Sequence, residues 1–550
     1  MIRYLILFLL LCTSTVFSQD TIPRYWIGFT DKINSNYTLN NPLGYLSERA
    51  ILRREKQAIL IDSLDLPVSQ LYIQSVLAAG DFELWAISKW LNGVIIKTQD
   101  TLALDSIVNF TFVESLDKLK SNLKPLADNK FDQELSSKST LISIENTSYF
   151  PFGLTYMQHH LHGSDVVQNL GFNGQGKHIA ILDAGFKNVD QTPALEHLIN
   201  ENRILSTYDF VRKENSVYED HYHGEAVLSI IAGYDPEYYV GSATKASFHL
   251  LISEDVFSET ITEEYYWVVA AEYADSAGVD IINTSLGYTT FDDSTTNHTY
   301  ADMNGHTTIA AKGLNVASSK GILCVTSAGN SGANSWKYIS TPADADLGLT
   351  VGAVDSNGIR APFSSQGPSF DGDIKPNVMS VGWNTYYISP GSSFADQGNG
   401  TSFSAPMMTG MVAALWEAMP ELTNLELIDL IEEYSHLYEQ PDSLMGYGIP
   451  NIYQLLLDNS NHQELFNSTT TILNVYPNPF NEELIVLYKS DSDKEIEIKM
   501  HSISGQIFYN NKFNVKMGVN KLRIFQANEL ALGIYLLSVD NEVIKAVKSK

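Results

Sequence analysis

Three hydroxyl side chains crowd one short stretch of the sequence. Residues 399–410 read NGTSFSAPMMTG, which places Thr401, Ser402 and Ser404 close together. The segment after Ser402, FSAPMMTGMVAALWEAM, is apolar on nearly every face and predicts a buried helix. Ser402 would lie at the N-terminus of this helix, where free amides and the helix dipole favour developing negative charge. We therefore expect Ser402 to be a nucleophile, whereas Thr401 caps the helix and Ser404 packs inside it.

A nucleophilic serine needs a base within hydrogen-bond reach and an acid that orients the base. The run HIAILDAG ends a predicted strand at Asp183, and the carboxyl ends of parallel strands are where α/β folds place their sites. DHYHGEAVLSIIAG places His223 at the head of an apolar helix. His221 competes for the role of base, but only His223 precedes a glycine, which lets a substrate approach. ILCVTSAGN ends at Asn330, whose amide could donate to an oxyanion.

These residues belong to a long segment in which strand-like and helical runs alternate. Residues 152–457 contain HIAIL, SFHLLIS, WVVAAEYADSAG, DIINTSLG, ILCVTSAGN and LTVGAV. Such alternation predicts an α/β domain with a parallel sheet and helices on both faces. We assign residues 151–458 to this domain.

Smaller units flank the α/β domain on both sides. Residues 19–118 mix strand-like runs such as YWIGFT with helical stretches, and predict a small α+β domain. Polar residues 119–150 read as a linker, and residues 459–473 as a second one. Residues 474–550 contain ELIVLY, EIEIKMHS and GIYLLSV, short alternating runs that predict a small β-sandwich.

The N-terminus and the composition limit the function classes. Residues 1–18 have an early cation, an apolar run and small residues, and predict a signal peptide. The run is too short for a span of ~20 residues, and no later segment is long and apolar enough, so we expect no membrane span in the mature protein. The formal net charge of −29 argues against nucleic acid as a partner. Cys324 would then be the only cysteine left, packed in a strand without a disulfide.

The order Asp, His, Asn, Ser, in the settings DAG, HGEAV, SAGN and GTSFSAP, resembles the subtilisin-like serine proteases. The resemblance covers about residues 175–451. It implies that Ser402 attacks the scissile carbonyl to form an acyl-enzyme, while His223 moves the proton and Asp183 orients the imidazole. Asn330 and the amide of Ser402 would bind the oxyanion. The motif SLG resembles the family's edge strand, which pairs with extended substrate; its residues are Ser285, Leu286 and Gly287.

Two positions depart from the family's usual pattern. Ala184 follows Asp183 where Ser or Thr is usual, and Glu225 follows the His-Gly pair where Thr is usual. A carboxylate at Glu225 would favour the charged imidazole of His223. We expect an activity optimum at neutral to alkaline pH, with an acidic limb set by His223.

The flanking units extend the resemblance. The N-terminal unit is placed like the propeptide of exported subtilisin-like enzymes, which assists folding and blocks the cleft until it is cleaved. The C-terminal unit, with YPNPF and GIYLLSV, is similar to sorting domains that direct Bacteroidetes proteins through type IX secretion. The implied partners are protein or peptide substrates, the propeptide as an intramolecular inhibitor and the type IX machinery. Export would pass the periplasm and outer membrane to a secreted or cell-surface location.

No cofactor is required by the implied chemistry. Calcium could bind acidic loops, as it does in many subtilisin-like enzymes, but no stretch identifies a metal site. The HHLH cluster at residues 159–162 reads as packing, because its spacing does not place three imidazoles on one helix face. Two other functions stay open: a non-catalytic binding or adhesion protein with the protease fold, and an acyl hydrolase for esters or small peptides.

Overall fold

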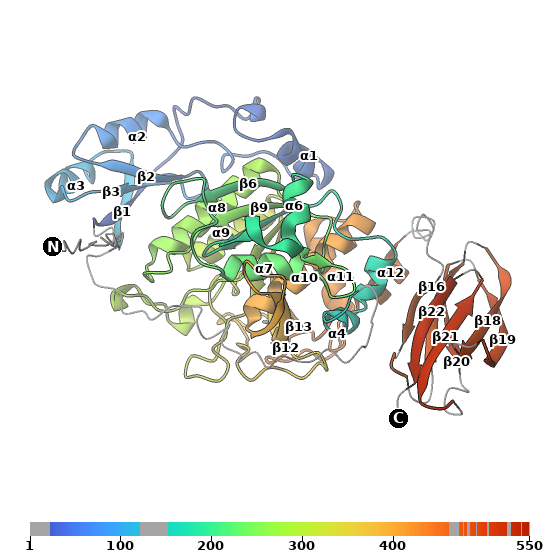
Figure 1. The fold of residues 1–550 in the computed structure, drawn as a ribbon. Coiled ribbons are helices and arrows are strands. Elements are labelled where there is room, and N and C mark those ends of the chain that lie inside the picture. The colour runs from blue at the N-terminus through green and yellow to red at the C-terminus, as the bar shows by residue number, and fades with distance from the viewer. Residues whose placement is uncertain are drawn as a thin grey trace, which may run out of the picture.

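The computed structural model describes residues 22–120, 152–460, 472–476, 478–480, 484–490, 492–502, 505–516, 518–524, 530–540 and 542–548. Figure 1 shows an α+β unit, a large α/β domain and a strand-rich unit, in that order along the chain. The predicted signal peptide and most of the two predicted linkers lie outside the described residues.

The central domain is built on a sheet of seven parallel strands in the order β13-β12-β11-β10-β5-β9-β6. The strands are β5 (His178–Asp183), β6 (Ile204–Asp209), β9 (Ser247–Ile252), β10 (Ile281–Thr284), β11 (Leu323–Ser327), β12 (Leu349–Val354) and β13 (Val378–Val381). The predicted parallel sheet is therefore confirmed.

Helices cover both faces of the sheet, as expected. One face packs against α7 (His223–Ala232) and α10 (Thr401–Ala418), and the other against α8 (Thr262–Ala277) and α9 (Ile309–Ser319). Alternate residues of β5 enter the two cores, and this double burial explains the nearly continuous apolar strands. The remaining helices and strands are α4 (Tyr156–His160), α5 (Ser164–Asn169), α6 (Glu196–Asn200), α11 (Asn424–Glu433), α12 (Ile452–Asn459), β7 (Tyr234–Asp235), β8 (Tyr239–Val240), β14 (Trp383–Ile388) and β15 (Ala395–Asn399).

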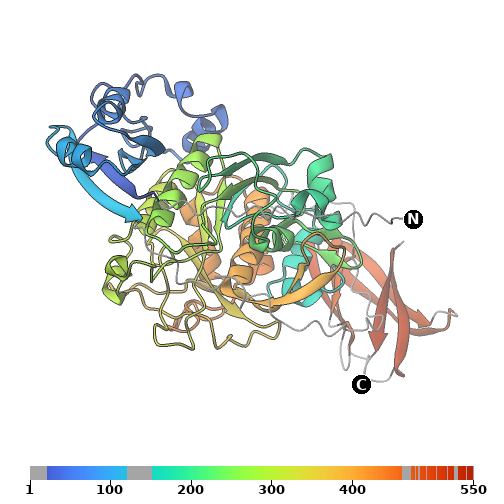
Figure 2. The same ribbon diagram turned by 60° about the vertical axis from the view of Figure 1, so that its left-hand side comes forward.

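The N-terminal unit is an antiparallel sheet in the order β2-β3-β1-β4 with three helices. Its elements are β1 (Arg24–Phe29), α1 (Glu48–Lys56), α2 (Gln70–Leu77), β2 (Glu83–Ser88), β3 (Gly93–Lys97), α3 (Thr101–Ile107) and β4 (Val113–Lys120). One face of the sheet packs on α2 and α3 in a core of its own. The other face joins the core of α8 and α9 through Trp26, Trp90, Ile95 and Leu119. Figures 1 and 2 both show this unit lying on the α8 side of the central domain.

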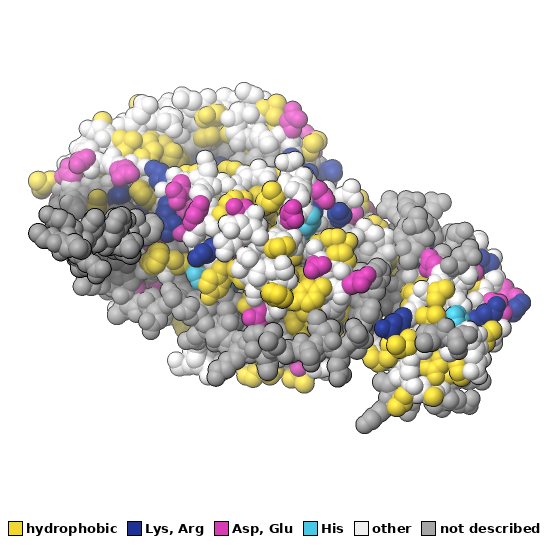
Figure 3. All heavy atoms as spheres, viewed as in Figure 1, with side chains coloured by type: hydrophobic (Ala, Val, Ile, Leu, Met, Phe, Trp, Pro, Cys, Tyr) yellow, Lys and Arg dark blue, Asp and Glu magenta, His cyan; other side chains and the backbone are white. Residues whose placement is uncertain are grey.

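The C-terminal unit is a β-sandwich of two antiparallel sheets, β16-β17-β20 and β19-β18-β21-β22, around one core. Its strands are β16 (Ile472–Tyr476), β17 (Leu484–Ser490), β18 (Lys494–Ser502), β19 (Ile507–Val515), β20 (Gly518–Ile524), β21 (Gly533–Val539) and β22 (Glu542–Lys548). None of the helices in the described part of the chain combines the length and the apolar character that crossing a membrane requires. On the face drawn in Figure 3, basic side chains are interspersed with acidic ones.

Candidate active site

A buried Asp–His pair joins the end of an inner strand of the sheet to the start of a core helix. Asp183 is the last residue of β5, and His223 is the first residue of α7. Because an ionised carboxylate only accepts hydrogen bonds, Nδ1 of His223 donates to Oδ1 of Asp183, at 2.7 Å. The amide of Ala184 donates to the same oxygen, at 2.7 Å. The pairing fixes a proton on Nδ1, which leaves Nε2 as the basic nitrogen.

Gly224 allows close packing between α7 and the turn after β5. Its amide donates to the carbonyl of Gly185, at 2.9 Å. A Cβ at Gly224 would lie 2.5 Å from that carbonyl oxygen and 3.0 Å from Cβ of Asp183. The glycine therefore lets α7 approach the turn after β5, so that His223 reaches Asp183.

Ser402 is buried in the first turn of α10, beside the helix that carries His223. Figure 1 shows α7 and α10 next to each other at the centre of the domain. The ring of Phe403, which follows Ser402, lies 6.3 Å from the ring of His223 between centroids. Ser404 packs inside the helix, where its hydroxyl donates to the carbonyl of Thr401, at 2.9 Å.

The prediction that Thr401 caps α10 is wrong, because Gly400 is the N-cap and Thr401 is the first helical residue. Its hydroxyl instead accepts from the amide of Gly329, at 3.0 Å, and donates to Oδ1 of Asn330, at 3.1 Å. The amide of Thr401 also donates to Oδ1 of Asn330, at 2.9 Å. Both contacts engage the oxygen of the Asn330 amide, so Nδ2 is the end that can donate toward an oxyanion.

Pro406 is the sixth residue of α10, beyond its first turn. Because proline has no N–H, it leaves the carbonyl of Ser402, four residues earlier, without its helical donor. The hydroxyl of Ser285 donates to this carbonyl instead, at 2.9 Å. Asn283 in β10 donates to Ser285, at 3.2 Å, and accepts from Thr409 in α10, at 2.8 Å. Sequence reasoning missed this polar chain, which fixes the backbone of Ser402 from the sheet.

The segment of Ser285, Leu286 and Gly287 continues β10 toward the site without forming a regular strand. Leu286 packs on Ala184 and Val256. Between described residues, no backbone hydrogen bond involves this segment. A backbone with open donors and acceptors is what strand pairing with a peptide requires.

Glu225 does not act on the imidazole in the way we predicted. The side chain is fully buried in α7, and burial raises the pKa of Glu225 to about 8. With this pKa the carboxyl group is mostly uncharged at neutral pH. It therefore does not supply the negative charge that we expected to stabilise a charged His223.

Comparison with known proteins identifies the family. Residues 174–448, half of the chain, match the model of the subtilase family. The chain belongs to the subtilase family. Subtilisin E of Bacillus subtilis (strain 168) is 28% identical over 315 residues, which cover 56% of this chain and 72% of that protein. Subtilisin DY of Bacillus licheniformis is 29% identical over 276 residues, 50% of this chain and 86% of that protein. The crystal structure of MycP1 with the N-terminal propeptide removed aligns with a TM-score of 0.43 and 22% identity, over 55% of this chain and 96% of that chain.

Family membership makes this chain a serine endopeptidase, and two further models match its flanks. Residues 24–137 match the peptidase S8 propeptide domain of Bacteroidota. Residues 474–550 match the secretion system C-terminal sorting domain, which indicates export to a secreted or cell-surface location.

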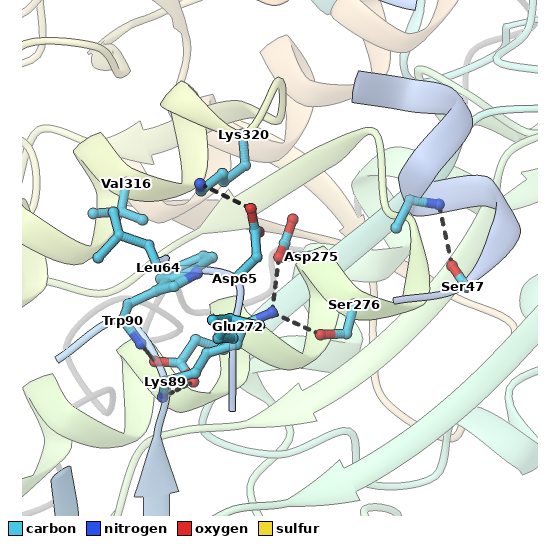
Figure 4. Close-up of polar contacts among 12 residues, drawn as sticks. Ser47, Leu64, Asp65, Lys89, Trp90, Glu272, Asp275, Ser276, Val316 and Lys320 are labelled. Carbon is cyan, nitrogen blue, oxygen red and sulfur yellow. Dashed lines mark hydrogen bonds and ion pairs between the residues drawn. The ribbon is translucent and has the colours of Figure 1, made fainter. Parts of the chain in front are cut away.

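The propeptide unit of this subtilase is held on α8 by two buried carboxyl groups (Figure 4). Glu272 accepts from the amides of Lys89 and Trp90, at 2.8 and 3.0 Å, and from the hydroxyl of Ser88. Asp275 binds the cations of Arg53, Arg54 and Lys89. Burial by itself would raise the pKa of Asp275, but these three cations lower it to about 2.

Three other ionisable residues of the subtilase domain are buried and stabilise the fold. Burial lowers the pKa values of His159 and His162 to about 4, and both rings are hydrogen-bonded inside the domain. Burial raises the pKa of Cys324 to about 12.

Two groups of described side chains each bring three potential ligand atoms within 4.8 Å of one another: His306, Asp346 and Asp371; Glu254, Glu259 and Glu263.

Proposed function

We propose that this subtilase hydrolyses peptide bonds through a triad of Ser402, His223 and Asp183. The observation that carries the proposal is the buried Asp183–His223 hydrogen bond beside the first turn of α10. Nε2 of His223 takes the proton of Ser402 as Oγ attacks the scissile carbonyl. The protonated ring returns this proton to the leaving amine, and water then hydrolyses the acyl-enzyme by the same steps. Asp183 keeps the tautomer and stabilises the imidazolium.

The negative oxygen of the tetrahedral intermediate would accept from Nδ2 of Asn330 and from the amide of Ser402. The contacts of Thr401 with Asn330 support this role, since they hold the amide oxygen away from the oxyanion. Preorganised donors of this kind stabilise the transition state without reorganisation during the reaction.

An extended peptide substrate would pair with the backbone of Ser285, Leu286 and Gly287. No backbone hydrogen bond from another described residue occupies this segment, which supports the assignment. Its side chains are otherwise engaged, because Ser285 supports Ser402 and Leu286 packs on Ala184. The affinity of this segment would then come from hydrogen bonds to the backbone of the peptide and would not depend on the substrate side chains.

The propeptide would act as an intramolecular inhibitor, with the sorting domain as the signal for the type IX machinery. We assign residues 19–118 to the propeptide, 119–150 to the connecting linker, 151–458 to the subtilase domain, 459–473 to the second linker and 474–550 to the sorting domain. The buried contacts of α8 support retention of the propeptide before and after its cleavage.

The test compares the wild type with Ser402→Ala, both produced in one export host. We expect the wild type to lose its N-terminal unit by intact mass and to digest casein, whereas Ser402→Ala stays full length and inert. Ser404→Ala is the matched control and should behave like the wild type. Equal behaviour of wild type and Ser402→Ala would refute the triad and favour a non-catalytic binding protein.

A further inference from the structure

Glu225 is a buried carboxyl group on the helix that carries the proposed base. The side chain is 0% exposed and lies two residues after His223 in α7. Its Oε1 lies 2.8 Å from the hydroxyl of Thr192. Its Oε2 is buried and has no hydrogen-bond partner among the described residues. A carboxyl group in these surroundings needs an explanation, because an ionised one would be poorly solvated.

The contacts of Thr192 bear on the ionisation state of Glu225. The Thr192 oxygen has three polar neighbours: the amide of Gly391 at 3.0 Å, the carbonyl of Asn188 at 3.0 Å and Oε1 of Glu225 at 2.8 Å. The amide donates, and the hydroxyl has a single proton for the two remaining neighbours. An ionised Glu225 would compete with the Asn188 carbonyl for that proton. With a protonated Glu225 that donates to Thr192, all three contacts are hydrogen bonds.

Within the part of the chain that the structure describes, no Lys or Arg acts on the pKa of Glu225. On its own helix, His223 lies two residues away, and Glu225 acts on Tyr239 in β8 and Tyr387 in β14. Burial raises the pKa of both phenols, which stay neutral, and Asp396 and Tyr222 act on Tyr387 in the same direction. Burial likewise raises the pKa of Glu225 to about 8, and it outweighs a hydrogen bond from Thr192, which would lower the pKa.

The Glu225–Thr192 contact ties the helix of the base to the hairpin that leads to the nucleophile. Gly391 lies in the turn between β14 and β15, and β15 ends at Asn399, immediately before Gly400 and α10. A second tie joins the same helix and hairpin, since the amide of Ile388 donates to the hydroxyl of Ser229, at 3.0 Å.

We infer that Glu225 is a positioning residue that works as a neutral carboxylic acid, donating its proton to Thr192 and so holding α7 and His223 in register with Ser402. The inference rests on the proposed triad. Loss of the proton leaves a buried charge beside Thr192 and draws the Thr192 hydroxyl away from the Asn188 carbonyl. This rearrangement shifts α7, and activity falls on the alkaline side while substrate binding is retained.

Glu225→Gln separates the proton from the shape of the side chain. The Gln amide still donates to Thr192 but cannot ionise. For a group with a pKa of about 8, kcat of the wild type should be about thirtyfold lower at pH 9.5 than at pH 7. Glu225→Gln should match the wild type at pH 7 and change by no more than about twofold up to pH 9.5. Glu432 is a half-buried carboxyl group with a raised pKa outside α7, and Glu432→Gln should keep the alkaline limb.

A spectroscopic measurement tests the proton independently of catalysis. In the inert Ser402→Ala background, infrared difference spectra at pH 7 should show one carboxylic C=O band that Glu225→Gln removes and Glu432→Gln does not remove. The band should disappear with the same midpoint as the loss of kcat in the wild type. An ionised Glu225 at pH 7, or an alkaline limb that persists in Glu225→Gln, would overturn the inference while leaving the triad intact. Failure of the triad would instead leave the band in place, while the wild type and Ser402→Ala show the same activity.

Discussion

Replacing Asp275 with Asn should loosen the propeptide. Oδ1 of Asp275 lies 2.6 Å from Nη2 of Arg53 and 2.8 Å from Nη2 of Arg54, and Oδ2 lies 3.0 Å from Nζ of Lys89. The carboxylate is fully buried, and its pKa of about 2 keeps it ionised in any protease assay. Because this pKa is lowered, the contribution of Asp275 is complete above its ordinary value of 3.8 and is lost only as the pH falls through about 2.

The magnitude follows from burial. Removing one partner from a buried ion network costs about 3–5 kcal/mol, since the remaining charges stay desolvated. All three cations belong to the propeptide unit, so this cost weakens docking by about 10²–10⁴-fold. Asp62→Asn is the matched control at the same interface. Asp62 lies 2.8 Å from Nζ of the buried Lys320 but is itself 51% exposed in its side chain. Lys320 keeps its ion pair with the buried Asp65 when Asp62 is replaced, so we expect Asp62→Asn to weaken docking less than Asp275→Asn.

The assay uses the Ser402→Ala chain with a recognition site for another protease inserted between residues 121 and 149. After cleavage there, size-exclusion chromatography and dilution kinetics measure how fast the N-terminal unit dissociates. We expect the parent and Asp62→Asn to retain it and Asp275→Asn to release it. Equal retention by Asp275→Asn and Asp62→Asn would refute the assignment of the buried network as the main anchor.

Three further substitutions or labels test other parts of the account. Asn330→Ala should lower kcat with little change in KM; removing this donor in subtilisin costs about 10²–10³ in kcat, and an unchanged kcat would exclude the oxyanion role. Gly224→Ala should destabilise the domain by about 1–3 kcal/mol in urea unfolding and lower kcat, because the new Cβ meets the Gly185 carbonyl; a fully active, stable variant would contradict this packing. Cys324 should resist iodoacetamide at pH 8 in the native enzyme, since its buried thiol has a pKa of about 12, and rapid labelling would show that β11 is accessible.

The sequence predicted the fold where local patterns determine it. The alternation of apolar strands and helical runs was sufficient for the parallel sheet, because double burial leaves strands apolar on both faces. Asp183 was recognisable because it is a polar residue at the carboxyl end of an apolar strand. The carboxyl ends of parallel strands are where α/β folds place their sites. The sandwich followed from the period of two in strands such as β18.

Contacts between distant segments were not predictable in this way. Glu225 is buried against Thr192, 33 positions earlier in the chain. The donor for the carbonyl of Ser402 comes from Ser285, 117 positions earlier. The sequence shows that Pro406 has no N–H to donate to this carbonyl. Only the packed structure shows that Ser285 donates in its place. For the same reason Thr401 seemed to be a cap, although its hydroxyl binds the segment after β11.

The most direct test of the central claim is covalent labelling of the matured enzyme with a fluorophosphonate, which reacts with activated serines. Intact mass and peptide mapping would identify the modified residue. The account predicts a single adduct on Ser402 that His223→Ala abolishes and Ser404→Ala retains. An adduct on another residue, or equal labelling of the wild type and His223→Ala, would contradict it.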